Sequence, residues 1–214
     1  MFFEYLGIPG SGKTYYANKY KERLTRDNMS FLDVSRKRTM PLWLKIFYKL
    51  AEMLLLKLPK YRHQIMEYEQ LCKQYSQKPK YLPFSLDYCI KDIVLASLLH
   101  DVFNSKDKIF INDEGQLQRI VFLIVQYGIP FDKVWAIYKN RRSVNTCYID
   151  LDVETAFRNI RNRNRHVCPM DEMDDENLKA YLQDCLDVCN MIKEMMMSNK
   201  ESKHNFVDIR KRTK

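Results

Sequence analysis

The feature that most constrains this chain is the octapeptide Gly-Ile-Pro-Gly-Ser-Gly-Lys-Thr at residues 7–14, which matches the pattern G-x-x-x-x-G-K-[ST]. A short apolar run at residues 2–6 precedes it, and a helical pattern at residues 13–26 follows it. Glycines at these positions let backbone N–H groups surround a phosphate with no Cβ in the way, and the helix directs the positive end of its dipole at the same place. The chain has five glycines and three of them lie in this loop, which argues against an ordinary glycine-rich turn.

The loop therefore predicts a site for ATP, or a related nucleoside triphosphate, bound as its magnesium complex. In such a site Lys13 reaches the β- and γ-phosphates, and the hydroxyl of Thr14 binds Mg²⁺. The residues expected to hold the nucleotide are Gly7, Pro9, Gly10, Ser11, Gly12, Lys13 and Thr14.

A second candidate element is the apolar run at residues 108–112, which ends in the carboxylates of Asp113 and Glu114. In a phosphate-loop protein the acid at such a strand end meets the magnesium, so Asp113 is the expected metal residue beside the loop. Either carboxylate is a candidate base for a proton from an incoming hydroxyl. Asp150 and Asp152, at the end of another predicted strand, are the alternatives.

The rest of the chain alternates short apolar strands with helices. Strands are predicted at residues 2–6, 30–34, 108–112, 146–151 and 206–209, and helices at 13–26, 116–127, 131–140, 153–163 and 178–196. Residues 37–105 have helical character with no strand signal, and prolines 41, 59, 79 and 83 divide them into three or four helices. Strands separated by helices indicate an α/β fold with a mostly parallel sheet covered on both faces, and 214 residues fit one such domain.

Four arginines follow the strand predicted at 146–151, namely Arg158, Arg161, Arg163 and Arg165. Phosphoryl transfer spreads negative charge over the transferred group, and cationic side chains stabilise that charge. We interpret Arg161, Arg163 and Arg165 as catalytic on this ground. A solvated basic helix is the alternative.

The order of loop, acidic strand end and arginine run resembles the small-molecule kinases of the thymidylate-kinase and adenylate-kinase type, over residues 1–36 and 106–209. The resemblance implies a P-loop NTPase three-layer sandwich over residues 1–214, with a helical insertion at 37–105 between the second and third strands and a lid at 158–174. Asp113-Glu114-Gly115 with Gln118-Arg119 is also similar to uncharacterised kinase-like proteins of bacterial surface-polysaccharide gene clusters.

The chain departs from this family in two places. Thymidylate kinases carry an Asp-Arg pair where this chain has Asp113-Glu114. The lid arginine nearest the adenine falls at or beside Asn159, so either Arg158 replaces it or no residue does.

The middle of the chain holds most of the excess positive charge. Residues 36–62 contain eight basic side chains and a single acid, Glu52, which accounts for seven of the net nine positive charges. In a kinase, Arg36 after the second strand and Arg119 in the helix predicted at 116–127 are candidates to bind an anionic acceptor. Basic and aromatic residues together also suit an anionic membrane surface, over 37–62, or nucleic acid, for which there is no strong signal. Helical core with solvated lysines is the simplest alternative.

Two functions remain open from the sequence. The first is a kinase that moves the γ-phosphate of ATP to a hydroxyl or phosphate of a nucleotide, sugar or surface-polysaccharide precursor. The second is a nucleotide-dependent regulatory ATPase that acts on a partner, membrane or nucleic acid. No signal-peptide pattern precedes the glycine loop and no CxxC pair occurs among the six cysteines, so we expect a cytoplasmic protein with reduced thiols.

Overall fold

The computed structural model describes residues 1–35, 41–75, 78–103, 108–138, 145–163, 169–198 and 205–210. Its centre is a sheet of five strands in the order β2-β3-β1-β4-β5, and every neighbouring pair is parallel. The strands are β1 (Phe2–Leu6), β2 (Phe31–Asp33), β3 (Ile109–Asn112), β4 (Asn145–Asp150) and β5 (Asn205–Arg210).

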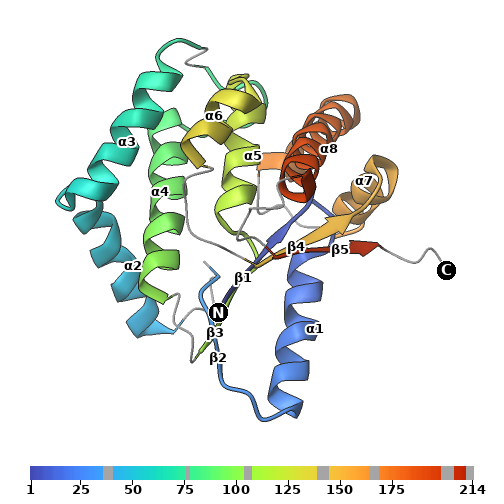
Figure 1. Ribbon diagram of the computed structural model, residues 1–214. Coiled ribbons are helices and arrows are strands. Elements are labelled where there is room, and N and C mark those ends of the chain that lie inside the picture. Colours follow the sequence, from blue (N-terminus) through green and yellow to red (C-terminus); the bar gives the residue numbers. More distant parts are fainter. Residues whose placement is uncertain are drawn as a thin grey trace.

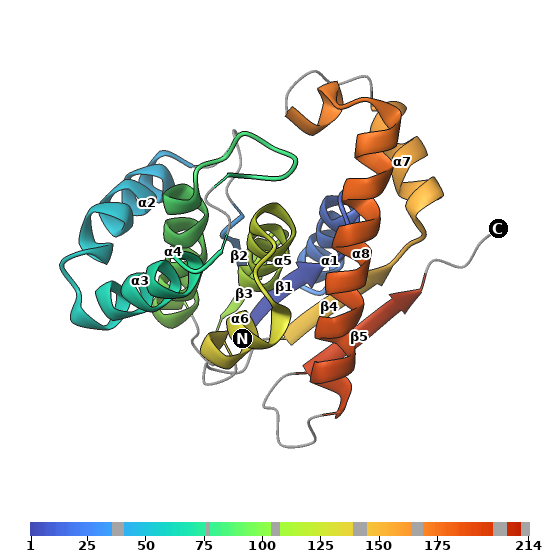
Figure 2. The ribbon, with the colours of Figure 1, turned by 90° about the horizontal axis from the view of Figure 1, so that it is seen from above.

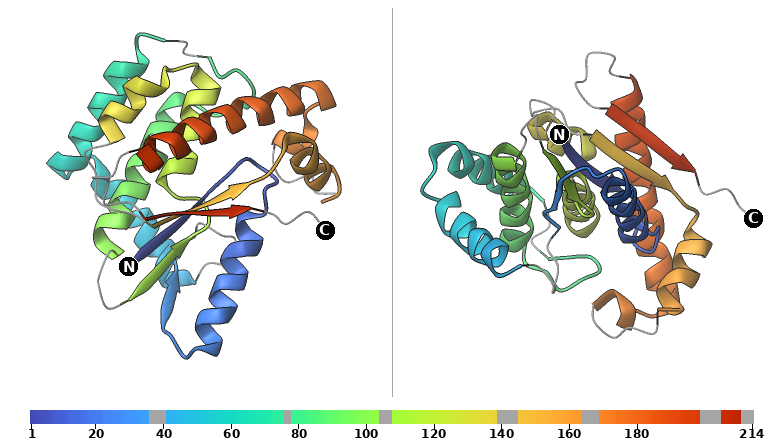
Figure 3. Two further views of the ribbon diagram at one scale, coloured as in Figure 1. Left: turned by 45° about the vertical axis from the view of Figure 1, so that its right-hand side comes forward. Right: turned by 90° about the horizontal axis from the view of Figure 1, so that it is seen from below.

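Helices cover both faces of this sheet (Figure 1). On one face lies α1 (Lys13–Arg26), which packs Ala17 and Leu24 against Tyr5, Ile111 and Ile149. The opposite face carries α5 (Gln116–Tyr127) and α8 (Asp175–Ser198), as the left view of Figure 3 also shows.

The helical insertion extends the molecule to one side of α5. Next to α5 lies α4 (Leu86–Phe103), and outside it lie α3 (Pro59–Cys72) and α2 (Leu42–Leu55) (Figure 2). The remaining elements are α6 (Phe131–Tyr138), α7 (Val153–Arg161) and a 3-10 turn at Pro169–Glu172. Within the described residues no helix has the length and apolar character needed to cross a membrane.

The α/β fold, the parallel sheet and the helical insertion predicted from the sequence are confirmed. Pro41 precedes α2 and Pro59 is the first residue of α3, so these prolines mark helix starts as their missing N–H predicts. The largest difference is in α8, which begins three residues before the predicted 178. Its first turn holds Asp175 and Glu176, which favour a helix N-terminus but are invisible to an apolar pattern. The division into one domain with a lid at 158–174 stays a prediction.

A buried carboxylate joins β1 to the start of α5. Glu4 is 1% exposed, accepts hydrogen bonds from the backbone N–H groups of Gln116 and Leu117, and accepts one from the Thr146 hydroxyl at 3.4 Å. A Cβ at Gly115 would lie 1.9 Å from the Glu4 Oε2 atom, so only glycine fits there. Burial raises the pKa of Glu4 from 4.5 to about 7, although the hydrogen bonds oppose this shift.

This raised pKa predicts how the stability depends on pH. The folded chain keeps Glu4 protonated at pH values where the unfolded chain has already ionised it, so the free energy of unfolding falls as the pH rises from 4.5 to about 7. The loss is about 3 kcal/mol at most. Glu4→Gln removes this contribution, and should therefore gain stability relative to the parent protein as the pH rises.

Urea unfolding at pH values from 4.5 to 8 measures the effect. Glu176→Gln, at an exposed position of α8, is the matched control. An equal pH dependence in Glu4→Gln and in the control would contradict the prediction.

Candidate active site

The loop at residues 7–12 connects β1 to α1 and has a backbone that only glycines adopt easily. Gly10 and Gly12 have φ angles of +83° and +90°. At Gly10 a Cβ would also meet the carbonyl oxygen of Ala156 in α7 at 2.6 Å. The loop thus needs glycine both for its own turn and for the close approach of α7.

Two polar side chains of this loop are buried. The Lys13 ammonium donates to the carbonyl oxygens of Gly7 at 2.8 Å and Ile8 at 3.1 Å. Burial lowers the pKa of Lys13, and the carboxylates of Glu114 and Asp113 oppose this shift. The Ser11 hydroxyl is buried and has no hydrogen-bond partner among the described residues. A cation and an unpartnered hydroxyl beside glycine N–H groups fit a phosphate.

A chain of hydrogen bonds links the carboxyl ends of two strands to the start of α1. The Thr14 hydroxyl donates to Asp113 Oδ2 at 2.9 Å, and the Asp113 N–H donates to Ser35 Oγ at 3.0 Å. Within the described part of the chain no three His, Cys, Asp or Glu side chains form a metal cluster. A hydroxyl beside a single carboxylate nevertheless suits Mg²⁺, which takes few protein ligands and completes its shell with water and phosphate oxygens.

Two amide side chains hold the loop from opposite sides. The Gly7 N–H donates to Gln118 Oε1 at 3.3 Å, and Asn159 Nδ2 donates to the Gly10 carbonyl at 2.9 Å. The loop is therefore fixed to α5 and to α7 as well as to its own flanking elements.

A cavity of about 240 Å³ opens beside the loop. Pro9 and Lys13 line it, and the other lining residues come from α4, α5 and α8, from the segment before α4, from Glu114 before α5 and from the 3-10 turn. The lining residues are Pro9, Lys13, Leu82, Phe84, Tyr88, Cys89, Asp92, Glu114, Gln118, Arg119, Phe122, Met170 and Tyr181.

The polar side of this cavity centres on a buried ion pair. The Arg119 guanidinium donates from Nη1 to the carboxylate of Asp92. Its Nε atom is buried and has no hydrogen-bond partner among the described residues. The cavity is thus lined by both a cation and an anion, and one N–H of the cation is left unsatisfied.

The predicted arginines differ in their surroundings. Arg161 donates to Asp175 Oδ1 at 2.8 Å and to the carbonyls of Asp171 and Met173, so it ties α7 to the start of α8. Arg158 donates to the Thr155 hydroxyl at 3.3 Å, and Arg163 is exposed. The remaining two predicted arginines, Arg36 and Arg165, lie outside the described residues.

Asp150 and Asp152, the alternatives to Asp113, have other partners. Asp150 lies 3.5 Å from the Lys193 ammonium, and Asp152 accepts from the Thr155 N–H at 2.8 Å as the N-cap of α7. Of the three acids, the one hydrogen-bonded to Thr14 is Asp113.

The α/β fold of this chain is similar to that of a solved small-molecule kinase. The chain is similar to the deoxyadenosine kinase of M. mycoides with bound dCTP, at a TM-score of 0.54 and 13% identity, over 100% of this chain and 92% of the other. It is also similar to the same enzyme with bound dATP, at a TM-score of 0.50 and 14% identity, over 98% of this chain and 90% of the other. No protein-family model and no curated protein matches the sequence.

Several residues of the site were missed from the sequence. These are Gln118, Asn159 and Ser35, whose hydrogen bonds to the loop and to Asp113 come from distant parts of the chain. Asp92 could have been identified from the sequence, because it is an acid in the middle of the largely apolar α4. A buried acid in such a helix normally has a partner, and here the partner is Arg119.

We predict that Lys13→Ala weakens ATP binding by about 10- to 150-fold, because it removes a charge-assisted contact of about 1.5–3 kcal/mol to the phosphates. Titration calorimetry with ATP and Mg²⁺ measures the change. Lys19→Ala, on the exposed side of the same helix, is the matched control and should bind as the parent does. Equal affinity in the Lys13 variant and the control would rule out the loop as the phosphate site.

Proposed function

We propose that this protein is an ATP- and Mg²⁺-dependent kinase that transfers the γ-phosphate to a hydroxyl or phosphate of a small acceptor. The observation that carries the proposal is the cavity beside the glycine loop, which Lys13 lines. An acceptor in that cavity would lie next to the side chain that is expected to bind the γ-phosphate, as a direct transfer requires.

The shape of the cavity favours a compact acceptor with a flat apolar part. Its volume of about 240 Å³ is below the roughly 300–1,000 Å³ of most ligand pockets. Phe84 stacks on Tyr88 with ring centroids 5.8 Å apart, and Phe122 meets Phe84 edge-on at 5.4 Å. Such a wall suits a nucleobase, as does the likeness to a kinase with bound deoxynucleotides.

Polar groups would then orient the acceptor. Arg119 and Asp92 both line the cavity, so the guanidinium can donate to an oxygen or ring nitrogen of the acceptor and the carboxylate can accept from an amine or hydroxyl. We therefore rank a nucleoside or nucleotide first and a sugar or surface-polysaccharide precursor second. Arg36 is the further candidate for an acceptor that carries a phosphate.

The transfer needs a base for the acceptor hydroxyl, the γ-phosphorus of ATP as the electrophile, and groups that stabilise the negative charge on the phosphate oxygens. The acceptor oxygen forms a bond to the γ-phosphorus while the bond from that phosphorus to the β–γ bridging oxygen breaks, and ADP leaves. The acceptor hydroxyl proton passes to a carboxylate, for which Glu114 is the better candidate because it lines the cavity. Asp113, bonded to Thr14, would hold the metal with that hydroxyl, and the metal would neutralise the phosphate oxygens.

The arginine segment completes the proposed site. Residues 158–174 would form a lid, in which Arg163 and Arg165 stabilise the transferred phosphate and Arg158 lies near the nucleotide. Arg161 would keep the segment in place through Asp175. Because the Asn159 side chain bonds to the glycine loop, nucleotide binding and the position of this segment would be linked. We expect the reaction to take place in the cytosol.

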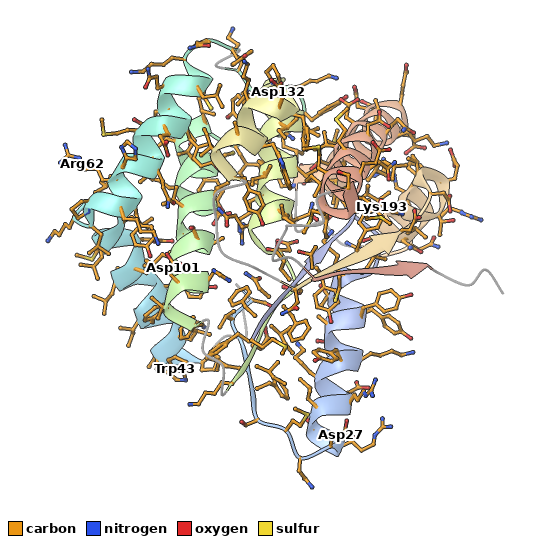
Figure 4. The ribbon with its side chains drawn as sticks, in the orientation of Figure 1. Asp27, Trp43, Arg62, Asp101, Asp132 and Lys193 are labelled. Atoms are coloured by element: carbon orange, nitrogen blue, oxygen red, sulfur yellow. The ribbon has the colours of Figure 1, made fainter. Side chains whose placement is uncertain are left out.

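A screen for acceptor-dependent ADP formation tests the proposed reaction. Purified protein is given ATP, Mg²⁺ and pools of nucleosides, nucleotides, sugars or sugar phosphates, with Lys13→Ala as the blank. Asp113→Asn should lower turnover by at least about tenfold in the active pool, because it removes charge from the metal-facing carboxylate. Asp132→Asn, at the surface of α6, is the control that should retain activity (Figure 4).

ATP hydrolysis that no acceptor accelerates would contradict the kinase and favour the regulatory ATPase. Unchanged turnover in a folded Asp113→Asn variant would instead show that another acid holds the metal.

If the arginines act on the transition state, Arg163→Gln should lower kcat by roughly 10²- to 10³-fold and leave the ATP dissociation constant nearly unchanged. Single-turnover kinetics and equilibrium titration separate the two quantities. Arg23→Gln, on the exposed part of α1, is the control. A parallel loss of ATP affinity and kcat would show that Arg163 binds the nucleotide in the ground state instead.

A further inference from the structure

The outward side of α2 is apolar and uncovered. Its inward side is already used, because Leu44, Tyr48, Ala51 and Leu55 are buried against the rest of the insertion. Opposite them, six large apolar side chains are between 45% and 73% exposed: Leu42, Trp43, Ile46, Leu50, Met53 and Leu54. These six residues are called the α2 outer face below.

The α2 outer face is a continuous strip. At about 100° per residue, its six members span roughly 120° of the helix circumference, and the buried side chains lie on the other side. It also lies on the outside of the molecule, since α2 and α3 form the edge farthest from α8 (Figure 2). Trp43 stands at the N-terminal end of the helix in Figure 4. A large flat object can therefore reach the strip without meeting the sheet or its covering helices.

Basic side chains flank the strip. Residues 41–58 contain three exposed lysines, Lys45, Lys49 and Lys57, and one acid, Glu52. On the helical wheel Lys49 and Lys45 fall beside Leu42 at one edge of the strip, and Glu52 falls just beyond Lys45 on the same side, so the two lysines lie nearer to the strip than the acid does. An apolar strip with a tryptophan at one end and lysines along one edge fits a partner that has an apolar interior under a negatively charged outer layer.

We propose that the α2 outer face docks on an anionic lipid membrane. The apolar side chains would enter the boundary between headgroups and acyl chains, Trp43 would lie at the headgroup level, and the lysines would contact lipid phosphates. None of the α2 outer face residues lines the cavity beside the glycine loop. Met53 lines a second cavity, which shares Tyr88 and Asp92 with the first, so the docking surface adjoins the proposed acceptor site without forming part of it.

A second copy of the chain fits this face less well. In a symmetric dimer with antiparallel α2 helices, the lysine edge of one copy would lie beside the lysine edge of the other. Like charges brought together in an apolar contact are unfavourable, whereas lipid phosphates neutralise them. The positive charge beside this face therefore favours an anionic membrane over a second copy of the chain as the partner.

Sedimentation with lipid vesicles tests the proposal on the whole protein. We expect the protein to bind vesicles that contain phosphatidylglycerol, and to bind pure phosphatidylcholine vesicles at least about tenfold more weakly. Raising the salt concentration should weaken the binding.

Two variants separate the contribution of the apolar side chains from that of the lysines. The triple variant Leu42→Ser, Ile46→Ser, Leu50→Ser should lose more than about tenfold in partition coefficient to the anionic vesicles.

The triple variant Lys45→Gln, Lys49→Gln, Lys57→Gln should lose a similar factor on anionic vesicles only. Matched controls change the same number of exposed side chains elsewhere. Met191→Ser, Met195→Ser, Met197→Ser alters α8, and Lys19→Gln, Arg23→Gln, Arg26→Gln alters α1. Both controls should bind vesicles as the parent does, and thermal melts verify that all variants fold.

Vesicle binding equal in the α2 variants and their controls would overturn the proposal, and so would no binding by the parent protein. Light scattering on the same samples identifies the competing occupant. A dimer that becomes a monomer in the Leu42, Ile46, Leu50 variant, with no vesicle binding by the parent, would assign the face to a second copy. Acceptor phosphorylation by these folded variants in solution would be unaffected, so the membrane proposal and the kinase proposal fail separately.

Discussion

The hydrogen bond from the Thr14 hydroxyl to the Asp113 carboxylate is the contact around which the candidate site is built. It joins the first turn of α1 to the residue that follows β3, and the Ser35 hydroxyl extends the link to the segment two residues past the end of β2. In a parallel sheet the carboxyl ends of neighbouring strands meet at one edge, so residues far apart in the chain converge there. Nucleotide, metal and acceptor groups would all depend on that convergence.

The ion pair between Arg119 and Asp92 places a buried positive and a buried negative charge beside the cavity. Charges are costly to bury, and Asp92 and Arg119 offset that cost for each other. Removing Asp92 would leave the buried Arg119 charge without this partner, so the pair is harder to change than a surface ion pair. In the proposed kinase, a cavity lined by Arg119 and Asp92 would discriminate by hydrogen bonding, because an acceptor without matching polar groups would desolvate these charges without replacing their hydrogen bonds.

Local signals were enough to predict the elements. Apolar periodicity located the five strands, and Pro41 and Pro59 marked the starts of two helices of the insertion. The glycine loop could be recognised in the sequence because its backbone requires glycine at fixed positions. The hydrogen bonds that hold the loop in place could not be predicted from the sequence. Asn159 and Gly10 lie 149 residues apart in the chain, and Gln118 and Gly7 lie 111 apart, so neither pairing leaves a pattern in any short window.

The contact between Gly115 and Glu4 has a consequence for how sequences of this kind can diverge. The two positions share a space that holds either the Glu4 carboxylate or a Cβ at residue 115, because the two atoms would lie 1.9 Å apart. A Cβ at 115 would also lie 2.4 Å from the Cβ of Glu4, so without a shift of the backbone it fits only if residue 4 becomes glycine, which removes the acceptor for two N–H groups at the start of α5. Substitutions at these sites should be inherited as a pair, with a serine or aspartate arising nearby to accept from those N–H groups.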